Sequence, residues 1–524
     1  MASTRQSSVS RRLTGLFAAG AALALGACSP GSPSPTPSSS GSASLCEAQG
    51  GACSPITLTI QDFSVAQRPV YDATIAAYEK LYPNVTVRWD TNPNQTAYYS
   101  GLTTQYSQNT LDDIFFYKTQ TGDPTGTMQQ LQQLGWIQPM QPAGDSTDIA
   151  TFENTWKADA GVQPSFIDGI NMQGGKPYSF PFTDTKAWGP GYFYWNKALF
   201  KKAGLDPNTP PATWSALMSD CATIKSKLSL PCFAMPMSPS NQLQRLWYAL
   251  SGSTQSDLFF DYKTGSFDLS EPGIQEAFTQ IQTMYNDGYI VPGLNTLAAS
   301  RSQMIAGQAV MYTDGAWIPG QVFGPAGFNN YGVAATPAPD AGRTGALSQL
   351  PTQNVYWVNS KIATTHAEAA WKFIQYITQP DGIFVQTYLK DNFGTLAYAN
   401  NAKYLGSNPQ LATVLSLGET KGFRVANPVP LQQCPDLAQS QAFAKATNAI
   451  STTAEWDAIA TALTSKSSLM AAATNIVNTR NNILTTTLAT EAGGATPLKV
   501  SINCYKFPTW NYTQDFDQKY SPPK

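Results

Sequence analysis

The sequence predicts an α/β protein with two or more lobes. Its 524 residues exceed the roughly 250–300 residues at which a single hydrophobic core stops growing. Near the start of the globular part, a strand, an amphipathic helix and a second strand follow one another at the spacing of a parallel βαβ unit. Charged residues make up 13 % of the chain and aromatic residues 11 %, so the surface must rely on neutral polar side chains.

The βαβ unit begins with the alternating segment "ITLTI" at 56–60. A helix follows, with Tyr71, Ile75 and Tyr78 on one stripe, and it ends before Pro83. Further strands are expected at 85–89 and 111–117. In open parallel sheets, ligands bind beyond the carboxyl ends of the strands. This rule selects the residues after the first and third strands: Gln61, Asp62, Phe63 and residues 117–123.

Three later segments predict helices. "PATWSALMSDCATIKSKL" has Thr213 as its N-cap, and "EPGIQEAFTQIQTMYNDG" repeats the same apolar spacing. "THAEAAWKFIQYITQPDG" begins with a Thr365/Glu368 capping box. The one histidine of the sequence, His366, falls in its first turn, so we expect a solvated residue there and not a catalytic base. With one histidine and no Cys/His cluster, no metal or other cofactor is expected.

The N-terminus has the composition of a signal peptide. Three arginines, Arg5, Arg11 and Arg12, precede the short apolar run "LTGLFAAGAALALGA". The following "Leu25-Gly26-Ala27-Cys28" resembles a bacterial lipobox, which implies cleavage after residue 27 and lipidation of Cys28. The alternative is an ordinary signal peptide with an incidental cysteine. Residues 29–44 are almost entirely Ser, Pro, Thr and Gly, so we expect 28–55 to act as a tether.

Cysteine usage suggests an oxidising compartment. Apart from Cys28, the chain has an even number of cysteines, which in an exported protein suggests three disulfides. Short separations favour Cys46–Cys53 and Cys221–Cys232, which leaves Cys434–Cys504. The alternative is that some of these are free, buried thiols.

The charge distribution argues against nucleic acid as a partner. The formal charge is −2, and no basic run occurs beyond the first dozen residues. Phosphate binding requires clustered Lys and Arg.

A family resemblance appears at residues 174–217, "GGKPYSFPFTDTKAWGPGYFYWNKALFKKAGLDPNTPPATWSAL". This segment resembles the extracellular solute-binding proteins of carbohydrate ABC importers, the maltodextrin-binding type. Three more blocks match that family in the same order, namely "AAYEKLYPNVTV" (76–87), "MIAGQAVMYTDGAW" (304–317) and "SKIATTHAEAAWKFIQYIT" (360–378). The resemblance covers about residues 56–400 and leaves the C-terminal part less clearly matched.

The resemblance implies a two-lobe periplasmic-binding-protein-like fold, with each lobe a sheet flanked by helices and a hinge between them. Lobe 1 would comprise 56–182 and 335–380, lobe 2 would comprise 183–334 and 381–490, and 491–524 would be a C-terminal extension. The hinges would fall near Phe182–Thr183 and Ala334–Thr336. A sugar or oligosaccharide would bind in the interlobe cleft and be delivered to the permease subunits of an ABC transporter. The protein would be a monomer on the extracytoplasmic face, attached to the membrane through its lipid only. No GxxxxGK[ST] motif is present, so another subunit would supply the energy.

Neutral sugars require aromatic platforms and polar groups, and these select the candidate ligand residues. Trp317 matches the family's cleft tryptophan, and the Gly and Ala before it would let the backbone approach the ligand; core packing is the alternative. Tyr192, Tyr194 and Trp357 are expected in the core instead. The full set of predicted ligand residues is Trp317, Trp188, Asp184, Asp314, Tyr117, Gln120, Asp62, Phe63 and Asn354.

Two other functions stay open at this point. A membrane-anchored glycoside hydrolase would need two carboxylates roughly 5–10 Å apart, and Asp62, Asp184 and Asp314 could supply such a pair. A binding protein for a peptide, polyamine or metal is the other alternative. No local motif places a catalytic acid, so we predict a binding protein and not an enzyme.

Overall fold

The structure is a computed structural model. It describes residues 53–92, 95–117, 127–156, 166, 171–180, 192–237, 250, 259–293, 295–345, 348–349, 356–391, 393, 396, 404–405, 409–419, 424–425, 428, 430–448 and 452–510. The predicted signal peptide, the lipidated Cys28 and the tether up to residue 52 lie outside these ranges. Among the described residues, no helix is both long enough and apolar enough to cross a membrane.

A six-stranded sheet forms the N-terminal half of the fold, with the order β2-β1-β3-β14-β4 and with β7 paired to β14. Its strands are β1 (Ile56–Asp62), β2 (Val85–Thr91), β3 (Ile114–Phe116), β4 (Ile137–Gln138), β7 (Ser179–Phe180) and β14 (Tyr356–Asn359). Strand β1 runs parallel to β2 and β3, whereas β14 is antiparallel to β3. The predicted parallel βαβ unit is therefore confirmed. The third strand is shorter than expected because Asp112 and Asp113 precede it and bind Arg88 and Thr59.

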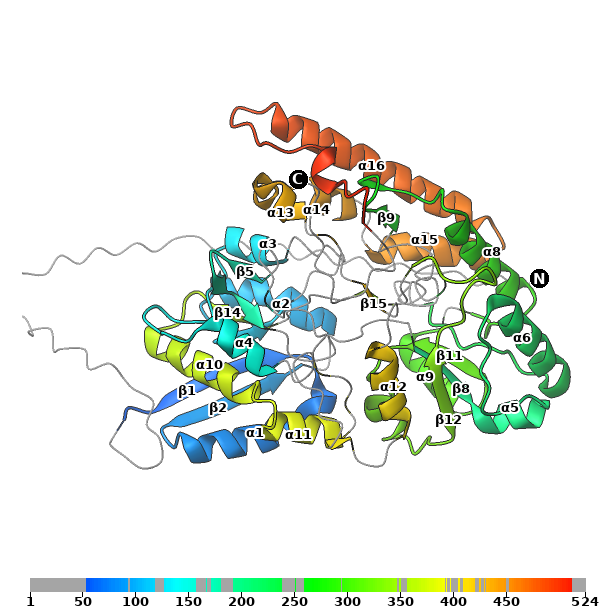
Figure 1. The fold of residues 1–524 in the computed structure, drawn as a ribbon, viewed down its shortest axis with the longest axis horizontal. Helices are drawn as coiled ribbons and strands as arrows, with labels where there is room; N and C mark the ends of the chain where they lie inside the picture. Colours follow the sequence, from blue (N-terminus) through cyan, green and yellow to red (C-terminus); the bar gives the residue numbers. More distant parts are fainter. Residues whose placement is uncertain are drawn as a thin grey trace, which may run out of the picture. The chain divides into compact units, whose positions relative to one another are not determined.

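Helices pack against this sheet (Figure 1): α1 lies against β2 and α10 against β1. They are α1 (Arg68–Leu81), α2 (Gln95–Ser107), α3 (Thr127–Gln133), α4 (Ile149–Trp156), α10 (Thr364–Ile377) and α11 (Ile383–Lys390), with the 3-10 turn η1 (Val65–Gln67) and the hairpin of β5 (Met172–Gln173) and β6 (Lys176–Pro177). Helix α11 packs on α1 and α10, although the predicted division placed residues from 381 onward in the other lobe.

A second, three-stranded sheet has the order β11-β8-β12 and is antiparallel throughout. Its strands are β8 (Tyr192–Asn196), β11 (Met311–Asp314) and β12 (Tyr331–Ala335). Every residue of β8 is buried, and because side chains alternate along a strand, this strand contributes to two cores. Tyr192 and Tyr194 join the core of the first sheet, whereas Phe193 and Trp195 join a separate helical core. The prediction that Tyr192 and Tyr194 are core residues is confirmed.

The elements of the C-terminal half and of this helical core are mostly helices. They are α5 (Lys197–Ala203), α6 (Trp214–Leu228), α8 (Pro272–Asn286), α9 (Leu297–Ile305), the π-helix η4 (Pro319–Phe323), α12 (Pro409–Glu419), α13 (Pro430–Gln433), η6 (Pro435–Ala438), α14 (Ala442–Asn448), α15 (Thr452–Thr464), α16 (Leu469–Ala492) and η7 (Ile502–Tyr505). Short strand pairs are β9 (Phe260–Asp261) with β10 (Ser266–Phe267), and β13 (Ser348–Gln349) with β15 (Arg424–Val425).

The predicted start of one helix was wrong. Helix α10 begins at Thr364 after an extended Ala363 and has no side-chain cap, so the Thr365/Glu368 capping box does not form. The side chain of His366 is not fully solvated either, since its Nδ1 lies 3.0 Å from a carboxylate oxygen of Asp113. By contrast, the predicted Thr213 cap of α6 is confirmed, with its hydroxyl accepting a bond from the Ala216 amide.

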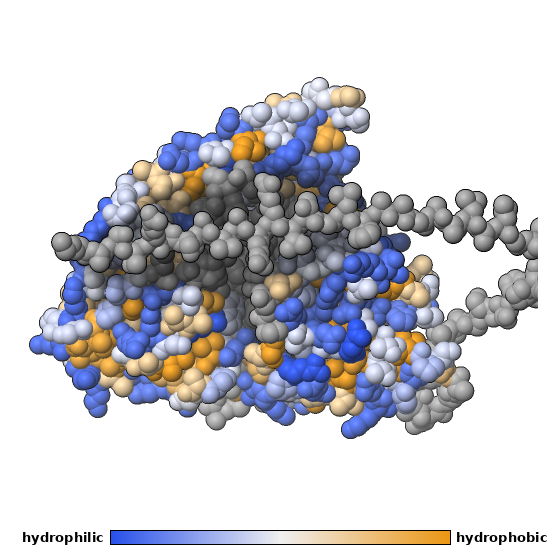
Figure 2. Space-filling model, turned by 180° about the vertical axis from the view of Figure 1, so that it is seen from behind, coloured by the Kyte–Doolittle hydropathy of each residue, from blue (hydrophilic) through white to orange (hydrophobic). Residues whose placement is uncertain are grey.

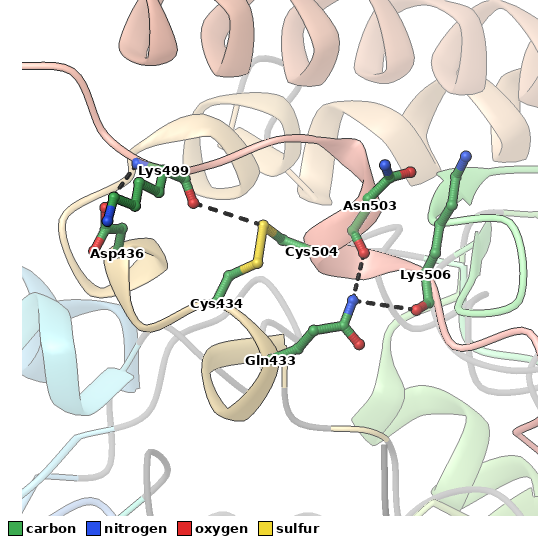
Figure 3. Close-up of a disulfide and its surroundings, with 7 residues drawn as sticks. All are labelled: Gln433, Cys434, Asp436, Lys499, Asn503, Cys504 and Lys506. Carbon is green, nitrogen blue, oxygen red and sulfur yellow. Dashed lines mark hydrogen bonds between the residues drawn. A yellow bond between two sulfur atoms is a disulfide. The ribbon is translucent and has the colours of Figure 1, made fainter. Parts of the chain in front are cut away.

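The C-terminal segment packs onto the helical core and is joined to it by a disulfide. Figure 3 shows the bond between Cys434 and Cys504, with the backbone amide of Lys499 donating to the Asp436 carboxylate. Farther on, Trp510 is buried against Tyr262. The described part of the predicted C-terminal extension, up to residue 510, is thus packed onto the fold.

Cys221 is bonded to Cys232, as expected. Cys53 is also disulfide-bonded. Its predicted partner Cys46 lies outside the described residues, so the Cys46–Cys53 pair stays a prediction.

Candidate functional site

Aromatic side chains gather where β1 and β3 end. Phe63 follows β1 and Tyr117 follows β3, and Tyr98 and Tyr99 of α2 lie beside them. The centroid of the Phe63 ring is 4.8 Å from that of Phe116 and 6.0 Å from those of Tyr98 and Tyr99, and Tyr99 is 5.8 Å from Tyr117. We call these five residues, Phe63, Tyr98, Tyr99, Phe116 and Tyr117, the strand-end aromatic group. Phe63, Tyr99 and Tyr117 are partly exposed, although the hydroxyl oxygen of Tyr99 is buried, so the group combines buried and partly exposed side chains.

Asp62 lies directly under this group and is fully buried. Its carboxylate accepts hydrogen bonds from the hydroxyls of Tyr71 and Tyr356, from the Trp89 indole at 3.3 Å and from the Ser64 backbone amide at 2.8 Å. These donors are all neutral. Burial raises the pKa of the Asp62 carboxyl, and the hydrogen bonds oppose this shift. The network fixes the turn that follows β1 and thereby the backbone that carries Phe63.

The turn after β11 positions Trp317. Strand β11 ends at Asp314, and Gly315 and the buried Ala316 lead to Trp317, which is partly exposed. A Cβ atom on Gly315 would lie 2.1 Å from atoms of the Trp317 ring, so this ring rests directly on the glycine backbone. The Tyr194 hydroxyl donates to the Gly315 carbonyl at 2.9 Å. The segment before this turn consists of α9, residues 306–310 and β11.

Asp314 is also fully buried, but its partners include a cation. Two nitrogens of Arg301 donate to its Oδ2 at 2.9 and 3.1 Å, together with the Tyr312 hydroxyl at 2.6 Å. The Gly315 amide donates to its Oδ1 at 2.8 Å. Burial lowers the pKa of Arg301, but the Asp314 charge and the hydrogen bonds outweigh it and hold that pKa above its usual value. Arg301 therefore stays charged and balances the buried carboxylate.

The structure positions five of the nine predicted ligand residues. Phe63, Tyr117 and Trp317 are partly exposed, whereas Asp62 and Asp314 are buried and serve as acceptors within the protein. Direct ligand contact by either aspartate would require these bonds to be exchanged, and it stays a prediction. Asp184, Trp188, Gln120 and Asn354 lie outside the described residues. Trp357 is in the core, as predicted.

Sequence reasoning missed Tyr98 and Tyr99. Two adjacent tyrosines between the expected strands 85–89 and 111–117 gave one signal that could have found them, because a helix following β2 starts at the carboxyl edge of the same parallel sheet. The missing information was which turn of α2 faces β1 and β3.

The described surface also has a hollow that could be considered as a ligand site. A surface hollow of about 570 Å³ lies beside α4 and is lined by Gln141, residues 145–150, Glu153, Met172 and Gly175, none of them predicted to bind ligand. The face shown in Figure 2 mixes hydrophilic and hydrophobic residues. Within the described ranges, no group of three or more His, Cys, Asp or Glu side chains could hold a metal ion.

Comparison with known proteins places these features in a family. The model of the bacterial extracellular solute-binding proteins matches residues 59–383. A protein named as a binding protein in Brucella abortus (strain 2308) is 25 % identical over 340 residues, covering 62 % of this chain and 72 % of the relative. The sn-glycerol-3-phosphate-binding periplasmic protein UgpB of the same strain is 25 % identical over 238 residues, covering 44 % of this chain and 52 % of UgpB.

Among solved structures, the cyclic alpha-maltosyl-1,6-maltose binding protein from Arthrobacter globiformis has a similar fold. Its TM-score is 0.56 at 19 % identity, and the match covers 82 % of this chain and 99 % of that protein. This likeness confirms the expected two-lobe α/β fold. The family match spans more than half of the sequence, and this chain therefore belongs to the bacterial extracellular solute-binding protein family.

Proposed function

We propose that this protein captures a neutral sugar or oligosaccharide and delivers it to the permease subunits of an ABC transporter. The strand-end aromatic group is the observation that carries this proposal. Three partly exposed rings stand at the carboxyl edge of the parallel sheet, where ligands bind in open α/β sheets. Aromatic faces pack against the apolar C–H faces of sugars, and phenol hydroxyls can bond to sugar hydroxyls.

Trp317 supplies the second part of the proposed site. Its ring is held on Gly315, and its turn is fixed by Asp314 and Tyr194. A rigid aromatic ring loses little freedom on binding, which favours affinity. We propose that Trp317 stacks on one sugar ring while Phe63, Tyr99 or Tyr117 contacts another part of the ligand. The similar fold of a protein named for binding a cyclic maltose derivative supports a sugar ligand.

A glycoside hydrolase is less well supported. Two of the three aspartates considered for catalysis, Asp62 and Asp314, are fully buried and already accept several hydrogen bonds. A catalytic acid or nucleophile must reach the glycosidic bond, and neither carboxylate is accessible in this arrangement. The proposal is therefore binding without turnover.

The proposed location is the outer face of the cell membrane. The lipobox-like "LGAC" and the tether after it support lipidation of Cys28, and two or three acyl chains would give a stable anchor. Incorporation of a labelled fatty acid into the full-length chain, and its loss in Cys28→Ala, would test this. A protein that stays membrane-bound and unlabelled would contradict it.

Thermal shift of protein produced from Ala43 onward tests the ligand class. The panel comprises glucose, maltotriose, raffinose, chitotriose and sn-glycerol-3-phosphate, the last included because of the UgpB relative. We expect stabilisation by at least one neutral sugar and no release of reducing ends in the same tubes. Stabilisation by sn-glycerol-3-phosphate alone, or turnover of a glycan, would overturn the proposal.

A further inference from the structure

One buried tyrosine lies between the two strands that carry the strand-end aromatic group. Tyr98 of α2 has only 4 % of its surface exposed. Its hydroxyl accepts a hydrogen bond from the Phe116 amide at 3.1 Å and lies 2.7 Å from the Phe116 carbonyl oxygen and 3.1 Å from that of Gln61. The residue therefore contacts β1 at the last residue that pairs with β3 and contacts β3 one residue beyond that pair.

The pairing of β1 with β3 stops at this point. The two strands align Ile60 with Ile114 and Gln61 with Phe115, and the next backbone groups along the edge are bridged by the Tyr98 hydroxyl. In a regular parallel pair, such groups bond directly at a strand spacing of about 4.8 Å. The Tyr98 hydroxyl contacts backbone groups of both strands and so ties the two strand ends together.

The aromatic contacts link this bridge to the accessible rings. The Tyr98 ring packs edge-on against Phe63, with the centroids 6.0 Å apart. Phe63 lies two residues beyond Gln61, and Tyr117 lies one residue beyond Phe116. Any change in the spacing of the strand ends must therefore move the backbones that carry Phe63 and Tyr117.

We propose that Tyr98 is a positioning residue for the ligand site. Its hydroxyl sets the separation of the carboxyl ends of β1 and β3 and so places Phe63 and Tyr117 against the ligand, without touching the ligand itself. This inference rests on the proposed sugar-binding function. It assigns binding energy to a hydroxyl that is buried beneath the rings.

The test uses Tyr98→Phe with Tyr78→Phe as a matched control. Tyr78 is also a buried tyrosine of the same core, but its hydroxyl has no hydrogen-bond partner among the described residues. Titration calorimetry would use the panel sugar that stabilises the unmodified protein most. We expect Tyr98→Phe to weaken binding about fivefold, the typical worth of one buried hydrogen bond, and Tyr78→Phe to leave the affinity within about twofold.

A double-mutant cycle separates positioning from general loosening of the fold. If Tyr98 acts through the rings, its substitution should have less than about a twofold effect in a Phe63→Ala, Tyr117→Ala background, because coupled residues are not additive. An unchanged affinity for Tyr98→Phe, or an equal loss in both backgrounds, would overturn the proposal.

A readout without ligand distinguishes this proposal from the proposed function. Hydrogen exchange should become faster in Tyr98→Phe for peptides covering 61–64 and 114–117 and stay unchanged for β2, while Tyr78→Phe leaves both unchanged. Unaltered exchange at 114–117 would overturn the positioning role. If no panel sugar binds the unmodified protein, the proposed function fails, and the exchange result still decides whether Tyr98 fixes the strand ends.

Discussion

Asp62 and Asp314 occupy equivalent places in the two sheets but are stabilised differently. Each is fully buried at the carboxyl end of a strand and accepts hydrogen bonds from tyrosine hydroxyls and a backbone amide. Within the described chain, Asp62 accepts from neutral donors, whereas Asp314 also binds the guanidinium of Arg301. The end of β1 is therefore stabilised by hydrogen bonds to Asp62, and the end of β11 also by the charge of Arg301 beside Asp314.

Removing the cation should have the largest effect. Arg301→Met would leave the Asp314 carboxylate buried without a positive partner, and breaking a buried pair typically costs about 3–5 kcal/mol. Urea unfolding at neutral pH would measure the loss in the free energy of unfolding. The double variant Arg301→Met, Asp314→Asn should recover much of this loss. A double variant whose loss in the free energy of unfolding equals the sum of the two single losses would contradict charge compensation at Asp314.

Substituting the two glycines that contact tryptophan rings tests whether Trp317 belongs to the ligand site and Trp195 to the core. A Cβ on Gly315 would lie 2.1 Å from the Trp317 ring, and one on Gly332 would lie 2.1 Å from the Trp195 ring. Trp195 is buried and cannot move aside, so Gly332→Ala should cost about 2–3 kcal/mol of stability. Trp317 is only partly buried, so shifting its ring disturbs less packing than shifting Trp195, and Gly315→Ala should cost about 1 kcal/mol.

Sugar affinity should show the opposite order for the same pair. Displacing the Trp317 ring in Gly315→Ala should weaken binding about tenfold, while Gly332→Ala should leave the affinity of its folded fraction nearly unchanged. Equal stability losses for the two variants, measured by urea unfolding, would show that Trp317 is held like a core residue.

Asp62 should have a smaller effect that depends on pH. Its folded pKa is raised by burial above that of the unfolded chain, so the native state binds the proton more tightly. The stability that this proton contributes is complete below about pH 4 and is lost as the pH rises through the raised pKa. In Asp62→Asn, the free energy of unfolding should therefore fall less steeply with pH above about pH 4. At pH 7 it should differ from that of the unmodified protein by only about 1 kcal/mol, because the neutral donors around residue 62 can also bond to an amide oxygen.

Unfolding curves at several pH values would measure this. The unmodified protein is the reference, because its Arg301 has a raised pKa and stays charged across the range, so the Arg301–Asp314 pair adds no pH dependence of its own. An Asp62→Asn curve parallel to that of the unmodified protein would show that Asp62 does not titrate with folding.

The sequence predicted the sheet positions better than the bonding within the site. Alternating and helical apolar patterns depend on local residues, so β1, α1 and β2 were found where expected. The partners of Asp62 come from α1, β2 and β14, separated by as many as 294 residues, and no local pattern encodes such contacts. For the same reason the sequence predicted a solvated His366. In the fold, Asp113, which is distant in the sequence, lies within hydrogen-bond distance of its ring.

Calorimetric titration of Trp317→Ala tests most directly whether Trp317 binds the ligand. The titrant is the panel sugar that stabilises the unmodified protein most. If Trp317 binds the sugar, the substitution should weaken the binding free energy by about 2 kcal/mol or more, as for a central aromatic contact. The melting temperature without ligand should stay close to that of the unmodified protein. Unchanged affinity combined with a large loss of stability would contradict it, because Trp317 would then be a core residue and not part of the ligand site.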